Sequence, residues 1–473
     1  MWSDRLAPSS RQALVKRLRR VLPPPQPDAR SQSVGLPWNC EALQVAAAFW
    51  PRPDFIWLDQ PDETRLLVDP VAVLTVRNGR ATVRGPHGTA RIKVRGFDLI
   101  EAALAAWGSS SAALLCGYLA YEMGGELEDV PPPPAHAGDL PDLHLGLYDH
   151  WLEKNAAGWR FCGTDAWRPV HEPDEPVAPT PDREAASSAS PISSTPSNEG
   201  FQAAVARTVS RIYKGELFQV NLCRRLETDL PASRIWPLYL RLRSISPASQ
   251  GALVRTGPRS AVLSVSPELF LSVRGGVARS CPIKGTRPRG ATPEKDRALA
   301  AALACSEKDR AELAMIVDVT RNDLGRVCAP GSVTVARHAE LVSLPTVHHT
   351  FSEVTGHLRQ ECGPADLLRA CFPPASITGA PKIRAMQLAS LEEGYRRGPA
   401  MGSIGWISLD GDMELSVAIR TAMAARERVW YLAGCGITAE SVPREELAES
   451  EAKAIAFLQA LGSAPAMVAA RES

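Results

Sequence analysis

Lys284 is the residue of this chain best placed for chemistry, because it lies in the stretch CPIKGTRPR (281–289), between turns that contain proline and glycine. Proline fixes φ and glycine permits tight turns, so a lysine between them is held in place. A held amine can act as a nucleophile once it loses its proton, which requires burial or nearby positive charge. A structural lysine at the end of a strand fits this stretch equally well.

A first pair of carboxylates lies on a predicted helix. The segment SEKDRAELAMIVDVT (306–320) is rich in good helix formers. Asp309 and Glu312 recur there at the same spacing as the apolar residues 315, 316 and 319, so the two acids are expected in line with a core-facing stripe. Acids in that position need a partner, although acids at a helix rim that reach water fit the same pattern.

A second pair lies near the C-terminus, in SVPREELAESEAK (441–453), which predicts a helix with a serine cap and a proline in its first turn. Glu446, Glu449 and Lys453 fall within an arc of roughly 60°, beside the apolar stripe. Taken alone, Glu449 and Lys453 are an ordinary surface ion pair. Two such acidic pairs on separate helices can instead meet around a hard divalent cation, and Mg²⁺ prefers carboxylates, substrate oxygens and water.

Seven motifs occur along the C-terminal half in a fixed order. They are ELFQVNL (216–222), SVSPELF (264–270), PIKGT (282–286), DVTRNDLGR (318–326), SITGAPK (376–382), GSIG (402–405) and GCGITA (434–439). With these motifs, residues of about 200–462 resemble the chorismate-utilising enzymes, and most closely the branch that forms aminodeoxychorismate. Any one motif is a weak signal, whereas the ordered set is specific.

The resemblance implies the fold and the cofactor. The fold would be α+β and like anthranilate synthase component I, with two intertwined α/β subdomains, an antiparallel β-sandwich core and outer helices. The cofactor would be Mg²⁺. Glu312 and Glu449 match the family's magnesium carboxylates, and Asp309 and Glu446 match the acids next to them.

The resemblance also implies how chorismate, a small dicarboxylate, is held. The matching positions are Gly285, Thr286, Ser376, Arg420, Gly434, Gly436 and Lys453. An arginine can form two hydrogen bonds to a carboxylate, and glycines let backbone N–H groups approach an anion closely. The two glycines at 434 and 436 also fit a tight strand exit, and Arg420 also fits an outward-facing strand residue.

Lys284 is the position that separates the reactions within the family, since anthranilate-forming relatives usually carry alanine there. The resemblance implies that the lysine attacks ring C2 of chorismate and expels the 4-hydroxyl, and that ammonia then enters at C4 and expels the lysine. Glu268 matches a general acid or base, and His349 matches an active-site histidine. Gln219 disfavours the isochorismate and salicylate branches, which carry a lysine base at that position.

Three positions depart from the family pattern. Ala400 stands where relatives carry an aromatic residue, Cys435 replaces a glycine, and Asp309 is one methylene shorter than the usual glutamate. None of these changes removes a charged catalytic group.

The partners follow from what the motifs omit. The chain shows no glutamine amidotransferase motif, so the resemblance implies that ammonia comes from a separate glutamine amidotransferase subunit, in p-aminobenzoate and folate biosynthesis. Two alternatives stay open. One is anthranilate synthase component I, and the other is a non-catalytic module that binds chorismate or an amidotransferase. Lys284 argues against the first, and the several mutually repelling carboxylates argue against the second.

Composition excludes other classes of protein. The 473 residues are 45% hydrophobic with a formal net charge of +1, which favours a large core and gives no field to attract nucleic acid or a membrane. The ten cysteines contain no C-x-x-C pair, and nothing ahead of them resembles a secretory signal. We therefore expect reduced thiols and a cytoplasmic protein.

The elements that must position these residues can be outlined. Strand-like runs at 54–58, 64–68, 71–77 and 80–84 predict one antiparallel N-terminal sheet within a region of 1–170. A Pro- and Ser-rich linker is predicted at 171–198, and the chorismate-binding catalytic domain at 199–465. Within the last region, 201–214 predicts a helix, and Asp410 and Gly411 predict a hairpin turn.

Overall fold

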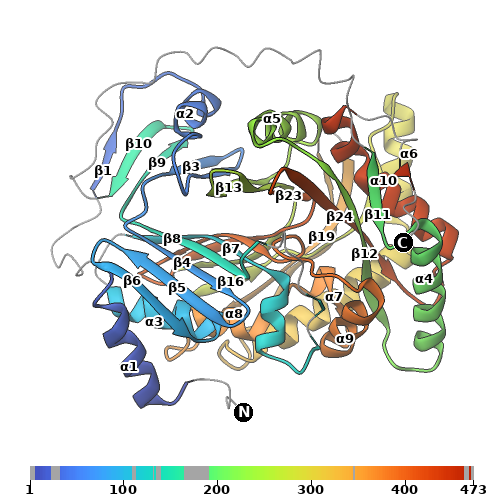
Figure 1. Cartoon of the computed structure of the whole chain (residues 1–473). Helices are drawn as coiled ribbons and strands as arrows, with labels where there is room; N and C mark the ends of the chain where they lie inside the picture. Colours follow the sequence, from blue (N-terminus) through green and yellow to red (C-terminus); the bar gives the residue numbers. More distant parts are fainter. Residues whose placement is uncertain are drawn as a thin grey trace.

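Two large β-sheets lie face to face in the computed structural model, with helices on their outer sides (Figure 1). The structure describes residues 6–22, 32–108, 113–131, 133–134, 140–163, 191–344, 347–462 and 468–469. Within these residues one sheet has 13 strands and the other has 12, and every pairing is antiparallel except that of β11 with β25. This arrangement confirms the α+β fold with a β-sandwich core.

The strands and helices have the following bounds. The 13-stranded sheet runs β1 (Gln32–Gly35), β10 (Gly158–Gly163), β9 (His150–Asn155), β3 (Glu63–Leu67), β2 (Ile56–Asp59), β13 (Gln250–Gly257), β14 (Ser260–Ser266), β23 (Thr421–Ala425), β24 (Arg428–Ile437), β12 (Gln219–Asp229), β11 (Ile192–Thr195) and β25 (Val468–Ala469), with β20 (Gly379–Ala380) on β12. The 12-stranded sheet runs β17 (Ile283–Pro288), β19 (Val347–His357), β16 (Val277–Ser280), β15 (Leu269–Arg274), β22 (Met413–Val417), β21 (Ser403–Ser408), β7 (Leu114–Leu119), β8 (Leu143–Tyr148), β4 (Ala72–Arg77), β5 (Arg80–Gly85) and β6 (Gly88–Lys93), with β18 (Thr334–Ser343) on β19. The helices are α1 (Pro8–Leu18), α2 (Ala42–Phe49), α3 (Gly96–Trp107), α4 (Asn198–Tyr213), α5 (Ile235–Ile245), α6 (Pro293–Ala304), α7 (Glu307–Gly325), α8 (Pro364–Cys371), α9 (Lys382–Glu393) and α10 (Pro443–Leu461), with short 3-10 turns at Tyr121–Glu126, Ala232–Arg234 and Ala375–Ile377.

The four N-terminal strands form as predicted, but the prediction of a single N-terminal sheet is wrong. β2 and β3 pair in the 13-stranded sheet, whereas β4 and β5 pair in the other sheet. The chain changes sheets at Asp69, which has a φ of +50°, and at the proline that follows it. Hydrophobic alternation marks the buried face of each strand, but it carries no information on which of two facing sheets the strand joins.

Early and late parts of the chain share both sheets. β2 pairs with β13, and β7 pairs with β21. Residues of the regions 1–170 and 199–465 therefore build both layers together, and the boundaries between these regions stay predictions. Most of the predicted linker lies outside the described residues, but its end forms β11, which pairs with β12.

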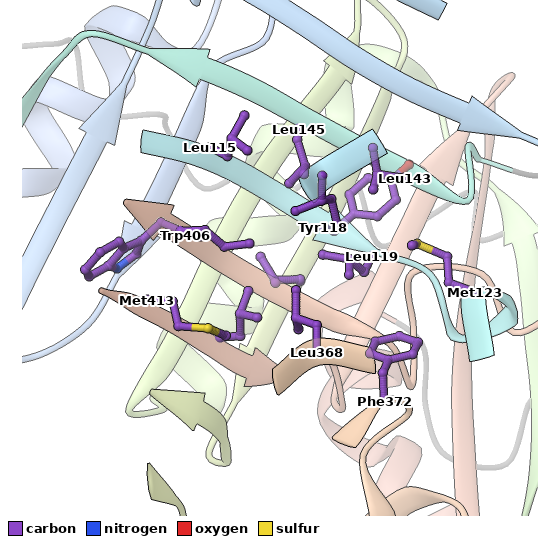
Figure 2. Close-up of a cluster of buried hydrophobic side chains, with 14 of the residues drawn as sticks. Leu115, Tyr118, Leu119, Met123, Leu143, Leu145, Leu368, Phe372, Trp406 and Met413 are labelled. Atoms are coloured by element: carbon purple, nitrogen blue, oxygen red, sulfur yellow. The ribbon is translucent and has the colours of Figure 1, made fainter. Parts of the chain in front are cut away.

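The largest core joins residues of both sheets to residues of the helices α1, α3, α7 and α8. Figure 2 shows Leu119 and Leu143 from the 12-stranded sheet facing Leu368 and Phe372 at the end of α8, with Trp406 and Met413 beside them. These side chains are almost fully buried. Truncating a buried Phe or Leu to Ala typically costs about 2–5 kcal/mol, so this cluster holds the strands that carry the site in place.

The predicted helices are confirmed in α4, α7 and α10, and the predicted hairpin is confirmed in β21 and β22. Helices α4 and α10 lie together at one end of the molecule, outside β12 and β24 (Figure 1). Among the helices of the described ranges, none combines the length and the apolar character that a membrane span requires.

Candidate active site

Lys284 is the second residue of strand β17, so it lies at the end of a strand, which the sequence left open beside a position between two turns. The pairing of β17 with β19 shifts between Lys284 and Thr286, so Gly285 forms a bulge with a φ of +75°. A Cβ on Gly285 would lie 2.8 Å from the side chain of Leu303 and 3.1 Å from that of Asp309. The bulge therefore needs glycine for conformation and for space, and it redirects the lysine side chain next to it.

The amine of Lys284 points to Glu312 on α7. Lys284 Nζ lies 2.7 Å from Glu312 Oε1, and the side chain of the lysine is only 12% exposed. Gln219 Nε2 at the start of β12 donates to the same oxygen. Burial opposes ionisation of Glu312, but Lys284, Gln219 and Lys453 outweigh it, so the pKa of Glu312 is lowered. The sequence-predicted nucleophile and one predicted metal carboxylate thus share one buried cluster.

The glycines of β24 bring the backbone against this cluster. A Cβ on Gly436 would lie 2.3 Å from Gln219 Nε2 and 2.8 Å from Glu312 Oε1. The carbonyl oxygen of Gly434 accepts a hydrogen bond of 2.8 Å from Lys453 Nζ. A side chain at 436 would displace the ends of Gln219 and Glu312, so glycine here allows the close approach of β24 to these side chains.

Helix α10 supplies Glu446, Glu449 and Lys453 along one edge, as predicted. Lys453 Nζ lies 2.8 Å from Glu449 Oε1, and both side chains are about half exposed. The serine cap is wrong, because Val442 occupies the N-cap position without a side-chain bond. Ser441 instead donates a hydrogen bond of 2.7 Å to Glu446 Oε1. Pro443 starts the helix without any capping side chain, which the pattern Ser-Val-Pro could not reveal.

Asp309 lies near the cluster but has a different partner. Arg287 on β17 forms an ion pair of 2.9 Å with Asp309 Oδ2. Ser306 caps α7 by accepting a bond from the backbone N–H of Asp309. Of the four predicted metal carboxylates, Asp309 and Glu312 are thus held by cations, and Glu449 is held by Lys453.

Glu268, Ser376 and Arg420 form the second half of the site. Glu268 and Ser376 both line a small internal cavity, and both are buried. Burial raises the pKa of Glu268 to about 7, against the lowering influence of Ser376, Lys284 and Arg420. Arg420 follows β22 with a φ of +49°, which turns it away from the alternating pattern of the strand. A carboxyl group that titrates near neutrality in a cavity is suited to proton transfer.

His349 and Thr286 face each other across β17 and β19. Thr286 Oγ1 and His349 Nδ1 lie 2.8 Å apart, and His349 Nε2 has no hydrogen-bond partner among the described residues. Burial, together with Arg420 and His348, lowers the pKa of His349 to about 4. The ring is therefore neutral near pH 7, and its free nitrogen is available to a ligand.

One group of possible metal-ligand atoms lies close together. It includes a cysteine that the sequence analysis did not assign to a metal site. In the described part of the chain, the group of acidic, histidine or cysteine ligand atoms within 4.8 Å of one another is Cys435, Glu446 and Glu449. Glu446 is 5% exposed, and its Oε2 has no partner in that part of the chain. A buried carboxylate oxygen without a partner, next to a second carboxylate, fits a site for a divalent cation.

Three partners of the site were missed from the sequence. They are Arg287 on Asp309, Ser441 on Glu446, and Thr350, whose hydroxyl donates to the carbonyl of Lys284. Arg287 follows the predicted site residues directly, so its place in the same strand was a usable signal. Thr350 has no such signal, because its contact depends on the pairing of β17 with β19.

Comparison with known proteins settles the family. A family model described as chorismate binding enzyme matches residues 53–459, which is most of the chain. The chain belongs to the chorismate binding enzymes. Its N-terminal strands from Ile56 onward fall inside the match, which agrees with their place in both sheets.

Curated relatives of this chain include both aminodeoxychorismate synthases and anthranilate synthases. Aminodeoxychorismate synthase of Streptomyces griseus is 42% identical over 327 residues, a match that covers 68% of this chain and 44% of that protein. This chain therefore spans less than half the length of that relative. Aminodeoxychorismate synthase component 1 of Klebsiella aerogenes is 36% identical, with coverage of 73% and 77%. Anthranilate synthase component 1 of Streptomyces coelicolor is also 36% identical, with coverage of 74% and 73%.

Two solved structures share the fold of this chain. Anthranilate synthase component I from Streptococcus pneumoniae TIGR4 superposes with a TM-score of 0.72 at 26% identity, covering 84% of this chain and 93% of that chain. MenF, the menaquinone-specific isochorismate synthase from Escherichia coli, superposes with a TM-score of 0.71 at 17% identity, covering 96% and 99%. The second likeness shows the fold alone.

Proposed function

We propose that this protein aminates chorismate at C4 to give 4-amino-4-deoxychorismate, with Lys284 as a covalent nucleophile. The observation that carries the proposal is the position of the Lys284 amine, which lies 2.7 Å from Glu312 in a buried cluster instead of reaching into solvent. A lysine of purely structural use would not need the glycine bulge that aims it there. The relatives named aminodeoxychorismate synthase support the same reaction.

The first step would form a bond between Lys284 Nζ and ring C2 and break the bond between C4 and its hydroxyl oxygen. Glu268, whose pKa burial raises to about 7, would donate a proton so that the hydroxyl leaves as water. In the second step ammonia would bond to C4, and the bond between C2 and Lys284 would break. Lysine and product leave with the same atoms that entered, apart from ammonia gained and water lost.

Substrate binding would use the polar groups that face this cluster. Arg420 lies close enough to Glu268 to lower its pKa, after Ser376 and Lys284, and its guanidinium is suited to a chorismate carboxylate. The N–H groups near Gly434 and Gly436 lie where a second carboxylate can approach without meeting a Cβ. His349, neutral through burial and the charge of Arg420, would offer Nε2 to a substrate oxygen.

Mg²⁺ is the cofactor that we propose for the carboxylates Glu312, Glu446 and Glu449, with Asp309 beside them. When bound, such an ion neutralises carboxylate charge and fixes the ring carboxylate of the substrate. Glu446 Oε2, buried and without a partner in the described residues, supports a cation at this position. Lys284 holds Glu312 by an ion pair, so withdrawal of this carboxylate would also release the amine for attack.

Ammonia would come from a separate glutamine amidotransferase, in p-aminobenzoate synthesis. The support is that the Klebsiella aerogenes relative is named component 1, which implies a second component. Free ammonium would replace the partner less effectively.

Formation of anthranilate is the second candidate, because the Streptomyces coelicolor relative named anthranilate synthase component 1 is as similar to this chain as the Klebsiella aerogenes relative is. Sequence identity alone does not separate the two reactions. The product does, since one enzyme retains the enolpyruvyl group and the other releases pyruvate.

The test incubates the purified chain with chorismate, Mg²⁺ and excess ammonium, and resolves the products by mass. We expect aminodeoxychorismate from the wild type and none from Lys284→Ala. Lys295→Ala, on the exposed face of α6, is the matched control and should retain activity. Anthranilate and pyruvate from the wild type would overturn the proposal, and so would an active Lys284→Ala variant.

A further inference from the structure

Cys435 places a sulfur atom beside the carboxylates of α10. Its side chain is fully buried on β24, and its Sγ lies 3.3 Å from the carbonyl oxygen of Glu446. A ligand atom of each of Cys435, Glu446 and Glu449 lies within 4.8 Å of the other two. The resemblance to the family places glycine at 435, so this sulfur belongs to this chain and not to the common site.

We propose that Cys435, Glu446 and Glu449 bind a thiophilic divalent cation of the zinc class, and that this ion competes with Mg²⁺ for the two carboxylates. The inference deepens the proposed function, because these are the carboxylates proposed for Mg²⁺. The inference rests on the proposed function only where it concerns the effect of the ion on turnover. Binding of the ion itself needs neither chorismate nor ammonia.

The carboxylate of Glu446 is the observation that points to a ligand here. It is 5% exposed, and Ser441 satisfies only one of its two oxygens. Oε2 has no partner in the described part of the chain, although a buried carboxylate oxygen normally has one. A carboxylate oxygen of Glu449 lies within 4.8 Å of a carboxylate oxygen of Glu446. A cation between the two carboxylates would provide the missing partner of Oε2 and offset their repulsion.

The donor set decides which cation fits. Mg²⁺ takes oxygen ligands, whereas Zn²⁺, Cd²⁺ and Co²⁺ accept a thiolate together with carboxylates. Three protein ligands leave a fourth position for water, as in zinc sites with an open position. The side chain of Glu449 is 51% exposed, so a hydrated ion can reach the group from solvent. On binding, Cys435 would lose its proton to solvent.

Two neighbours set the limits of this site. Lys453 forms an ion pair with Glu449, so the ion must displace an ammonium group from one carboxylate oxygen. Lys453 keeps a second bond to the carbonyl of Gly434, which can hold it in place. Cys435 also packs with apolar residues of β12 and α9, so a thiol that only fills the core is the competing explanation. That explanation accounts for burial of the sulfur but not for Glu446 Oε2, which has no hydrogen-bond partner in the described residues.

Cadmium titration tests the site directly. The metal-free chain is titrated with Cd²⁺, and the sulfur-to-cadmium charge-transfer absorption in the ultraviolet is followed. We expect the wild type to saturate at one tightly bound ion, and Cys435→Gly to lose this absorption with affinity weaker by more than about tenfold. Cys305→Ser removes an exposed thiol and should titrate like the wild type.

Two further measurements keep the result interpretable. Glu446→Gln retains the thiol and should also weaken Cd²⁺ binding, whereas thermal unfolding of each variant without metal shows that it is folded. Excess Mg²⁺ should weaken Cd²⁺ binding to the wild type. Equal Cd²⁺ titration by the wild type and Cys435→Gly would overturn the proposal, as would binding that Mg²⁺ and Glu446→Gln leave unchanged. Either result is independent of whether chorismate is aminated.

Discussion

Strand β12 contacts two buried groups of charged side chains. They differ in whether all their polar atoms have hydrogen-bond partners. Near its start, Gln219 meets Glu312 and the candidate active site. A few residues later, the carbonyl of Asn221 and the N–H of Cys223 meet the ion pair of Arg397 with Glu393. Both regions bury carboxylates against cations behind the same sheet, so the surroundings are comparable.

The Arg397 group is closed. Nε and Nη2 of the guanidinium donate to Glu393, Nη1 donates to the carbonyl of Ile377, and Nη2 also donates to the carbonyl of Asn221. The active-site group is open, because Gln219 Oε1 and Glu446 Oε2 have no partner in the described ranges. Closed polar networks hold a fold together, whereas groups left without partners are expected where a ligand completes them.

The same substitution in both groups should separate them by stability. Glu393→Gln leaves the buried charge of Arg397 uncompensated, and we expect a loss of about 3–5 kcal/mol in the free energy of unfolding. Glu446→Gln removes a carboxylate that Glu449 repels, and we expect a change within about 1 kcal/mol. Urea denaturation without metal measures both. Similar losses for the two variants would break the comparison.

The substitution with the smaller effect on stability, Glu446→Gln, should have the larger effect on Mg²⁺ binding. Mg²⁺ is expected to raise the unfolding temperature of the wild type and of a mildly destabilised control, but not of Glu446→Gln.

Glu268 and Glu122 sharpen the comparison through pH, since burial raises the pKa of each to about 7. As the proton donor in the first step, Glu268 must be protonated, so turnover should be level below about pH 7 and fall above it. Glu268→Gln should lower turnover by about 10²-fold or more and remove this dependence. Rates are compared at constant free ammonia, because its fraction also changes with pH. A rate that rises through pH 7 would assign Glu268 as a base.

Glu122 should change stability and not turnover. It accepts the backbone N–H groups of Arg397 and Gly398, within the closed region. Its pKa is raised from 4.5 to about 7 on folding, so its stabilising contribution is complete below pH 4.5 and is lost as pH rises through about 7. We expect this loss to be on the order of 3 kcal/mol, and to be absent in Glu122→Gln. An unchanged pH dependence of unfolding in that variant would contradict the account.

The sequence was sufficient where one element carries the signal. The periodicity of α7 and α10 placed Glu312, Glu446, Glu449 and Lys453 on their correct helices and edges. The resemblance carried by the motifs then assigned Lys284 and Glu268 to the same site. The local sequence pattern alone left that assignment open.

The sequence was insufficient where two distant elements decide. The turn at Asp69 decides that β3 and β4 join different sheets. The position of Lys284 depends on a bulge in the pairing of β17 with β19. The sequence shows Cys435 only as a departure from glycine. Its contact with Glu446 follows from how α10 lies on β24. Such contacts require the assembled fold.

The most direct test of the central claim is the capture of the covalent intermediate on Lys284. The chain is incubated with chorismate and Mg²⁺ without ammonia, then denatured, digested and analysed by mass spectrometry. The account predicts an adduct of chorismate minus water on the peptide that contains Lys284, and its loss when ammonium is added before denaturation. Formation of aminodeoxychorismate on addition of ammonia, with no adduct at Lys284 under any condition, would contradict it.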